Sequence, residues 1–255
     1  MRNLIKSELY RMLHSVTVVG VFILAILVFG LATFSVVAFK LGFYDSGIST
    51  PLNSLNLSPF ILRDAELFNT FIFCPVLFCS SFNYESTSGA YRLYLLRGYN
   101  KTKFILSKMI CCAIISFLLT IILFIIGTIF GLIFETKVES TTYFNGQNFN
   151  LVQALFYNFM IYLVNYLVIL VIMSVFSVVG VLASHVAITF VLGSGVCAGL
   201  VGVSSTKFEF LISSVKTAFN VFDGKNSSFI VTALCMIIGL CTLTTIIFNR
   251  KDYLY

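Results

Sequence analysis

Long apolar runs separated by short polar segments dominate the chain. A bilayer core about 30 Å thick requires roughly 20 apolar residues per helix, and several runs reach that length. Such runs form helices because lipid offers no partner for unpaired backbone N–H and C=O groups. The alternation typical of a transmembrane β-barrel does not occur. The pattern predicts six transmembrane helices, at residues 16–39, 67–84, 109–134, 154–178, 186–203 and 227–248.

Local features refine this pattern. The first run is longer than the core of a secretory signal, about 7–15 residues, and is therefore a retained helix. Pro75 lies in the second run and is expected to kink it, because proline cannot donate the helical hydrogen bond. The fourth and fifth helices share one stretch without Asp, Glu, Lys or Arg between Glu139 and Lys207, with a turn near residues 180–185.

The segments outside these helices also carry signals. Residues 204–226 are rich in aromatic and aliphatic side chains, such as Phe208 and Phe219. Solvated loops are rarely so apolar, so we predict a re-entrant outer segment of short helices between the fifth and sixth spans. Residues 41–65 contain two prolines and are expected to form a partly structured cap.

Residues 1–15 form an amphipathic pattern ahead of the first span. Leu4, Leu9 and Met12 fall on one side, whereas Lys6 and Arg11 fall on the other. This arrangement predicts an interfacial helix lying along the membrane surface. A charged flank of the first span is the alternative.

Composition excludes several classes of protein. The 255 residues are 59% hydrophobic and only 10% charged, with a mean hydropathy of +1.01, too few charges to cover a soluble surface. The seven cysteines lie in apolar runs without a metal-ligand spacing, so we predict no metal site. We expect an all-α integral membrane protein forming one transmembrane domain over residues 1–255.

The distribution of charge predicts the orientation. If the N-terminus is inside, the inner segments hold ten of the sixteen Lys and Arg and only three of the ten acidic residues. The positive-inside rule therefore places both termini in the cytoplasm. The net charge of +6 then reflects topology rather than nucleic-acid binding. We expect a multi-pass protein of the plasma membrane of a bacterial cell.

Motifs for catalysis are missing from the sequence. It contains no zinc-protease, nucleophile-elbow or P-loop pattern, so we predict that the chain is not an enzyme. Among ionisable residues only His185 lies close to a predicted span, which disfavours a proton- or sodium-driven carrier. Asn165 in the fourth span is a candidate for an interhelical hydrogen bond.

Two pairs of glycines have the spacing that lets membrane helices approach closely. Gly127 and Gly131 form one G-x-x-x-G pattern, and Gly195 and Gly199 form another. We predict helix packing at both pairs. Chance occurrence is the alternative, because glycine is common in membrane helices.

The polar segment at residues 85–108, between the second and third helices, stands out. Glu85 closes the second helix, and a short amphipathic stretch at residues 90–97 precedes Gly98, a typical helix stop. Asn100 can cap the helix that follows. One interpretation is a basic loop that anchors two helices to anionic lipid. The other is a helix in the membrane plane that receives a cytoplasmic partner.

This segment resembles the cytoplasmic signature of permease subunits of ABC-2 type transporters. That family has a Glu ending the second helix, a Gly-Thr followed by a basic residue, a Gly or Pro turn, a Ser-Arg-type pair and a Lys opening the third helix. Those places are taken here by Glu85, Gly89, Arg92, Gly98, Asn100, Lys101 and Lys108. The sequence departs from the pattern at Ala90, where Thr is usual, and at Asn100-Lys101 in place of Ser-Arg.

The resemblance extends to six spans, an interfacial N-terminal helix, re-entrant helices and a short basic tail. It implies a partner ATPase that binds ATP and Mg, because this chain has no P-loop, and a second permease copy, identical or not. The implied ATPase-coupling residues are Glu85, Gly89, Arg92, Arg97, Gly98, Lys101, Lys103 and Lys108. The path, which the resemblance places along spans one, two and five, would carry a hydrophobic or amphipathic substrate outward, such as an antimicrobial peptide or a drug-like molecule.

A second hypothesis is a membrane scaffold or sensor subunit that transports nothing. Its basic inner loop would recruit a cytoplasmic partner. In both hypotheses the chain contacts membrane lipid and no nucleic acid, and the residues that would bind a substrate are unknown.

Overall fold

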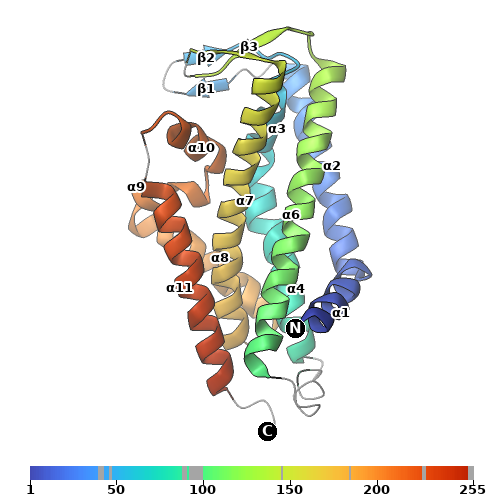
Figure 1. Ribbon diagram of the computed structural model, residues 1–255, viewed down its shortest axis with the longest axis vertical. Coiled ribbons are helices and arrows are strands. Elements are labelled where there is room, and N and C mark those ends of the chain that lie inside the picture. The colour runs from blue at the N-terminus through green and yellow to red at the C-terminus, as the bar shows by residue number, and fades with distance from the viewer. Residues whose placement is uncertain are drawn as a thin grey trace.

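The computed structural model describes residues 1–39, 43–45, 48–87, 91, 100–144, 146–183, 185–225 and 228–251. The side chains of residues 43–45, 48–49, 84–87 and 205–206 lie outside this description. Over the described residues the fold is a bundle of long helices with two small β-hairpins at one end (Figure 1). Six helical stretches are long and apolar enough to cross a membrane, so the chain is a multi-pass membrane protein.

The first half of the chain supplies three of these stretches. The short helix α1 (Arg2–Leu13) precedes α2 (Val16–Phe39), which has the bounds predicted for the first span. The second stretch, Leu57–Asn83, combines α3 (Leu57–Phe68), the π-helix η1 (Asn69–Phe73) and most of α4 (Cys74–Thr87). The third is α6 (Lys101–Phe134).

The second half supplies the other three. They are α7 (Leu151–Leu182), α8 (Val186–Val203), which again has the predicted bounds, and α11 (Ser228–Arg250). Between α8 and α11 lie α9 (Ser205–Phe208), the 3-10 helix η2 (Glu209–Leu211) and α10 (Ser214–Phe222). The predicted segment of short helices is therefore present. Its depth in a membrane stays a prediction, as does the cytoplasmic position of the termini.

The second span differs from its prediction. It begins at Leu57, ten residues before the predicted start, because its first turns contain Arg63, Asp64 and Glu66, which interrupt the uncharged run. The expected irregularity near Pro75 is a π-helical turn, in which the Cys74 N–H donates to the carbonyl of Asn69. A proline lacks the donor that the preceding turn needs, and the wider turn accommodates that loss.

The bundle has two distinct ends. We call the end with the hairpins β1–β2 (Phe43–Asp45 and Ile48–Thr50) and β3–β4 (Ser140–Thr142 and Asn148–Asn150) the apical end. Both hairpins are antiparallel. The opposite, basal end carries α1, the start of α6 and the last turns of α7 and α11 (Figure 1). The chain therefore starts near the same end of the bundle at which its last span finishes.

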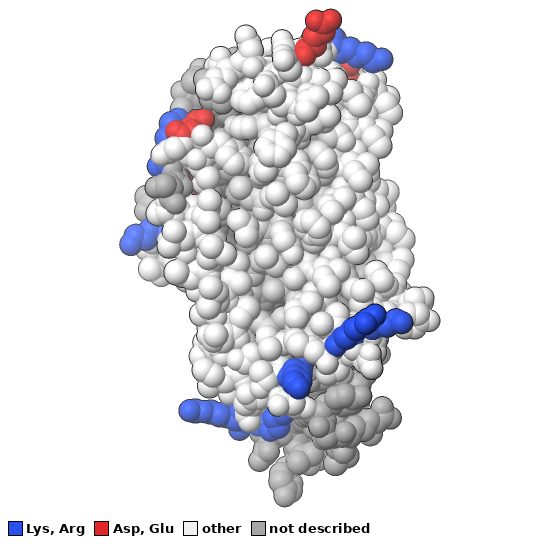
Figure 2. Space-filling model, in the orientation of Figure 1, with Lys and Arg blue, Asp and Glu red and all other residues white. Residues whose placement is uncertain are grey.

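The central helix is α7, which packs against α4, α6, α8, α10 and α11. Its buried positions fill the core, whereas few of the apolar side chains of α8 and α11 are buried. Figure 2 shows a broad uncharged band on one face, with charges of both signs toward the apical end and basic residues toward the basal end. Apolar side chains exposed over such a band fit a surface that contacts lipid.

The two glycine pairs have different surroundings. A methyl group added at Gly127 would lie 2.7 Å from Ser58 Oγ, and one at Gly131 would lie 2.5 Å from the Ser54 carbonyl oxygen. These contacts place α6 close to the start of the second span.

On α8 the close approach is at Gly193, where an added methyl group would lie 2.5 Å from the ring of Phe176. Gly195 and Gly199 meet no atom within 4 Å in the described part of the chain. The packing predicted for this pair does not occur within that part, because α8 meets α7 through the face that carries Gly193 and Cys197.

Candidate functional site

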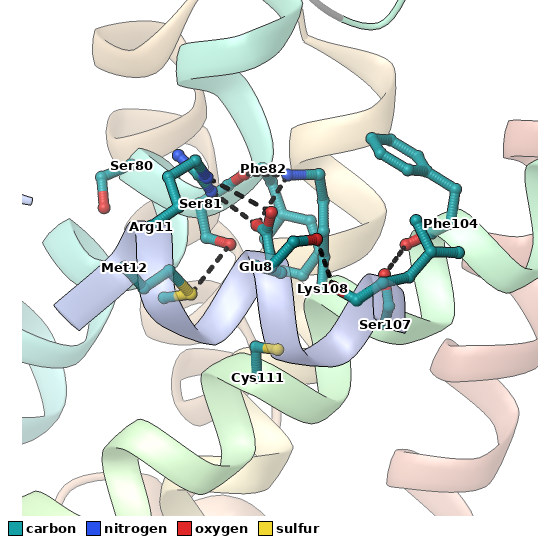
Figure 3. Close-up of polar contacts among 12 residues, drawn as sticks. Glu8, Arg11, Met12, Ser80, Ser81, Phe82, Phe104, Ser107, Lys108 and Cys111 are labelled. Carbon is teal, nitrogen blue, oxygen red and sulfur yellow. Dashed lines mark hydrogen bonds and ion pairs between the residues drawn. The ribbon is translucent and has the colours of Figure 1, made fainter. Parts of the chain in front are cut away.

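A buried cluster of charged side chains joins α1 to the helices around it at the basal end (Figure 3). Glu8 of α1 accepts from Lys108 of α6, with 2.8 Å between Lys108 Nζ and Glu8 Oε1. Arg11, one turn along α1, donates to both oxygens of the same carboxylate, over 2.5 Å from Nη2 and 3.2 Å from Nε. One carboxylate is thus shared by two cations.

The pair of Glu8 and Lys108 is almost completely shielded from solvent. The Lys108 side chain is 0% exposed and that of Glu8 is 7% exposed, whereas the Arg11 side chain is 31% exposed. Burial alone would raise the pKa of Glu8, but the charge of Lys108 and the hydrogen bond and charge of Arg11 outweigh it, so this pKa lies below its ordinary value. Glu8 is therefore held in its ionised form.

Lys108 makes further contacts that link α1 to α4. Its Nζ also donates to the Ser81 carbonyl oxygen over 3.2 Å. The ring centroids of Phe104 and Tyr91 lie 5.1 and 5.7 Å from the same nitrogen, within the range of cation–π attraction. A buried ammonium group thus has a carboxylate, a carbonyl and two aromatic rings around it.

Tyr91 is the described residue in the middle of the segment between the second and third spans. It is 5% exposed, and its hydroxyl donates to the Phe82 carbonyl oxygen of α4. Its ring packs edge-on against Phe104 of α6 and Phe248 of α11, with centroids 5.2 and 5.8 Å away. Tyr91 therefore connects this segment to three spans.

A second set of bonds ties the last span to the same end of the bundle. Lys101 Nζ donates to the Lys251 carbonyl oxygen over 3.0 Å, and Thr102 and Asn249 exchange side-chain hydrogen bonds. Lys251 Nζ in turn donates to the Val181 carbonyl oxygen near the end of α7, over 2.9 Å. Because cations favour helix C-termini, Lys251 is well placed to stabilise α7.

The predicted coupling residues separate into three groups. Lys108 lies wholly inside the bundle, where it contacts α1 and α4. Lys101 is half-buried and Lys103 is exposed at the start of α6. Asn100 caps this helix, as the sequence predicts, because its side chain accepts a hydrogen bond from the Thr102 N–H. The remaining predicted positions, Gly89, Arg92, Arg97, Gly98 and the side chain of Glu85, lie outside the described residues.

Sequence reasoning missed the roles of Glu8 and Tyr91. Glu8 lies four residues from both Leu4 and Met12, the two buried apolar positions of α1. An acidic residue at helical spacing from buried apolar residues faces the interior, which indicates a buried ion pair. The prediction of the orientation used only the number of charges and not this spacing.

A second buried acid corrects the expectation that only His185 lies near membrane depth. Glu66 belongs to the second span and is 5% exposed. Its carboxylate accepts from Ser214 Oγ over 2.8 Å and from the Val215 N–H over 3.1 Å. Asn165 donates to Ser214 Oγ over 2.7 Å, so this residue does bond between elements. These contacts fix the start of α10 to the bundle, while His185 is exposed before α8.

Metal binding has no support in the described part of the chain. Within it, no three His, Cys, Asp or Glu side chains are grouped as metal ligands would be. The seven cysteines are free thiols there, and five of them are buried.

Lowering the pH is expected to weaken the attachment of α1. Because the pKa of Glu8 is depressed on folding, its stabilisation is complete above the unfolded-state pKa and is lost as the pH falls through the folded-state pKa. As far as Glu8 determines it, we expect the free energy of unfolding to stay constant from about pH 7 to about pH 5 and to decrease below about pH 4, past the ordinary glutamate pKa. Thermal unfolding of the detergent-solubilised protein measures this. A decrease as large in the Glu8→Gln variant would contradict the assignment to Glu8.

Comparison with known proteins provides one match. A family model described as a protein of unknown function, DUF2705, matches residues 17–254, nearly the whole chain from the start of α2 to beyond α11. No curated protein matches the sequence at a significant level. Since the match covers far more than half of the sequence, the chain belongs to the DUF2705 family.

Proposed function

We propose that this chain is the membrane subunit of an ATP-driven exporter, whose ATPase is a separate polypeptide. The observation that carries the proposal is the connection of the segment between the second and third spans. Through Tyr91 and Lys108, that segment is joined to α1, α4, α6 and α11 at one end of the bundle. A force applied there by a partner would reach four helices through buried contacts.

The mechanism requires two arrangements of the basal end with different affinity for the ATPase. Closure of an ATPase dimer on ATP would press on the segment at residues 85–108 and on α1. Lys108 and Glu8 would transmit that displacement as one unit, because breaking a buried ion pair is strongly unfavourable. A ligand can shift such an equilibrium only by its difference in affinity for the two states.

The proposed substrate class is supported by the apolar character of the spans. We propose a hydrophobic or amphipathic molecule, such as a membrane-active peptide or a drug-like compound, moved outward between this chain and a second permease copy. The apolar faces that α8 and α11 expose are compatible with both a second copy and lipid. ATP and Mg would be bound by the partner ATPase.

The proposal is tested by co-purification with an ATP-binding-cassette ATPase encoded beside the gene. Charge reversal of Arg92 together with Lys103 is expected to reduce the recovered ATPase at least about tenfold, because like charges across an interface cost several kcal/mol. Lys103 is exposed at the basal end, so its reversal leaves the core intact. The matched control is Lys137→Glu, an exposed lysine between α6 and β3 at the other end.

Two outcomes would count against the exporter. Equal recovery of the ATPase with the basal and the apical variants would show that residues 85–108 do not dock it. Intact ATPase binding without substrate-stimulated ATP hydrolysis in liposomes would favour the scaffold or sensor subunit instead.

A further inference from the structure

Glu66 is a buried acid of the second span that forms no ion pair among the described residues. It is 5% exposed, and the groups that donate to its carboxylate, the Ser214 hydroxyl and the Val215 N–H, are neutral. Burying an ionised carboxylate without a cation is costly, so such a group is usually neutralised. Within a membrane span, an ionisable residue in these surroundings is a candidate functional site.

The elements packed against α3 supply few charges. Neither α2, η1 nor α7 contains a charged side chain or a histidine. The charged residues of α6 are three lysines at its start, at the basal end: Lys101, Lys103 and Lys108. On α3 itself Arg63 bonds to Asp64 over 3.0 Å, and Lys216 of α10 bonds to Glu209 over 2.9 Å. In the described part of the chain none of these groups forms an ion pair with Glu66.

A chain of two hydrogen bonds leads from Glu66 to α7. Ser214 Oγ lies 2.8 Å from Glu66 Oε2, and Asn165 Nδ2 lies 2.7 Å from the same Ser214 oxygen. Asn165 is 0% exposed, and its Oδ1 has no hydrogen-bond partner among the residues that the structure describes. Within that part of the chain the amide is held by one hydrogen bond, so no second bond fixes which of its two polar atoms faces Ser214.

The same positions of the three side chains fit both protonation states of Glu66. When Glu66 is ionised, the Asn165 amide donates to Ser214 Oγ, and the Ser214 hydroxyl donates to the carboxylate. When a proton is added, the carboxylic acid can donate to Ser214 Oγ, whose own hydrogen turns toward Asn165. A half-turn of the amide then presents Oδ1 as the acceptor, because an amide carries a donor and an acceptor of nearly equal size.

We propose that Glu66 is a proton-binding site inside the bundle, and that Ser214 and Asn165 form a reversible hydrogen-bond chain that accommodates proton uptake. The added proton forms an O–H bond on the carboxylate and breaks no covalent bond, so the site changes from one negative charge to none. The Val215 N–H keeps an acceptor in both states, because a carboxylic acid retains acceptor capacity. The start of α10 therefore stays attached. This site goes beyond the proposed export function and does not depend on it.

Infrared difference spectroscopy between alkaline and acidic pH, on the protein reconstituted in phosphatidylcholine vesicles, tests the proposal. Two signals are expected together: the carboxylic C=O band of protonated Glu66, and a shift of the Asn165 amide C=O band to lower frequency as that oxygen accepts a hydrogen bond. Glu66→Gln should lose both signals, whereas Asn165→Leu should lose the amide shift alone. The matched control is Glu139→Gln, an exposed acid before β3, which should leave the amide shift unchanged.

The pH range is the one over which circular dichroism shows the protein to be folded. Absence of the amide shift from the unsubstituted protein over that range would overturn the proposal, as would its persistence in Glu66→Gln. Ser214→Ala tests the chain with Glu66 and Asn165 both in place. This variant should keep the carboxylic band and lose the amide shift, and an amide shift that remains would show that Ser214 does not connect the two groups.

Discussion

The Glu8→Gln variant is expected to lose about 3–5 kcal/mol of unfolding free energy, because removing one partner of a buried ion pair leaves the other charge uncompensated. Lys108 is fully enclosed, and its carboxylate partner would be replaced by a neutral amide. Arg11 is partly exposed and can turn toward water, so most of the loss arises at Lys108. Unfolding in mixed detergent micelles, followed by circular dichroism, measures the difference.

Two further variants make this test specific. Glu209→Gln removes the acid of an exposed pair with Lys216, whose side chains are 46% and 45% exposed, and is expected to cost about 0–1 kcal/mol. The double variant Glu8→Leu with Lys108→Met removes both charges and should recover most of the stability. If Glu8→Gln costs no more than Glu209→Gln, the buried cluster does not hold α1 in place.

Gly131→Ala is expected to destabilise the protein by about 1–3 kcal/mol, the usual cost of overpacking a well-filled core. The added methyl group would meet the Ser54 carbonyl oxygen at 2.5 Å, which is backbone and cannot rotate away as a side chain can. Either α6 or the start of the second span has to move. The same unfolding assay measures the loss.

The matched control is Gly195→Ala on α8, a glycine with the same motif spacing. Its added methyl group meets no described atom within 4 Å, so the substitution should be neutral or stabilising by about 0.4–1 kcal/mol through the unfolded chain. A loss at Gly195 equal to that at Gly131 would show that α8 has a close partner that the single chain does not supply.

The positions of the spans could be largely predicted from hydropathy, and the reason for the exception is physical. The bounds of α2 and α8 match their predictions because uncharged runs and helices coincide there. The second span begins earlier because its charges are satisfied inside the protein: Arg63 pairs with Asp64 at 3.0 Å, and Glu66 holds the start of α10. A hydropathy rule that ends a span at the first charged residue does not account for charged residues that have partners within the protein.

The candidate site was less predictable. The polar segment at residues 85–108 was recognised from its composition, and Lys108 was among its predicted residues. The partner of Lys108 was not, because Glu8 lies 100 residues away and nothing in the spacing of either residue selects the other. Likewise, the spacing of Gly127 and Gly131 is the same as that of Gly195 and Gly199, and only the neighbouring helices distinguish them.

The long separation between Glu8 and Lys108 also constrains how the protein is made. At about 5–20 residues per second, a ribosome adds Lys108 some 5–20 seconds after Glu8. During that interval the carboxylate of Glu8 can pair with Arg11 but not with Lys108, so burying it would cost more than in the folded protein. We therefore expect α1 to remain at the water-exposed surface while the first two spans insert, and to become buried once the third span is in place.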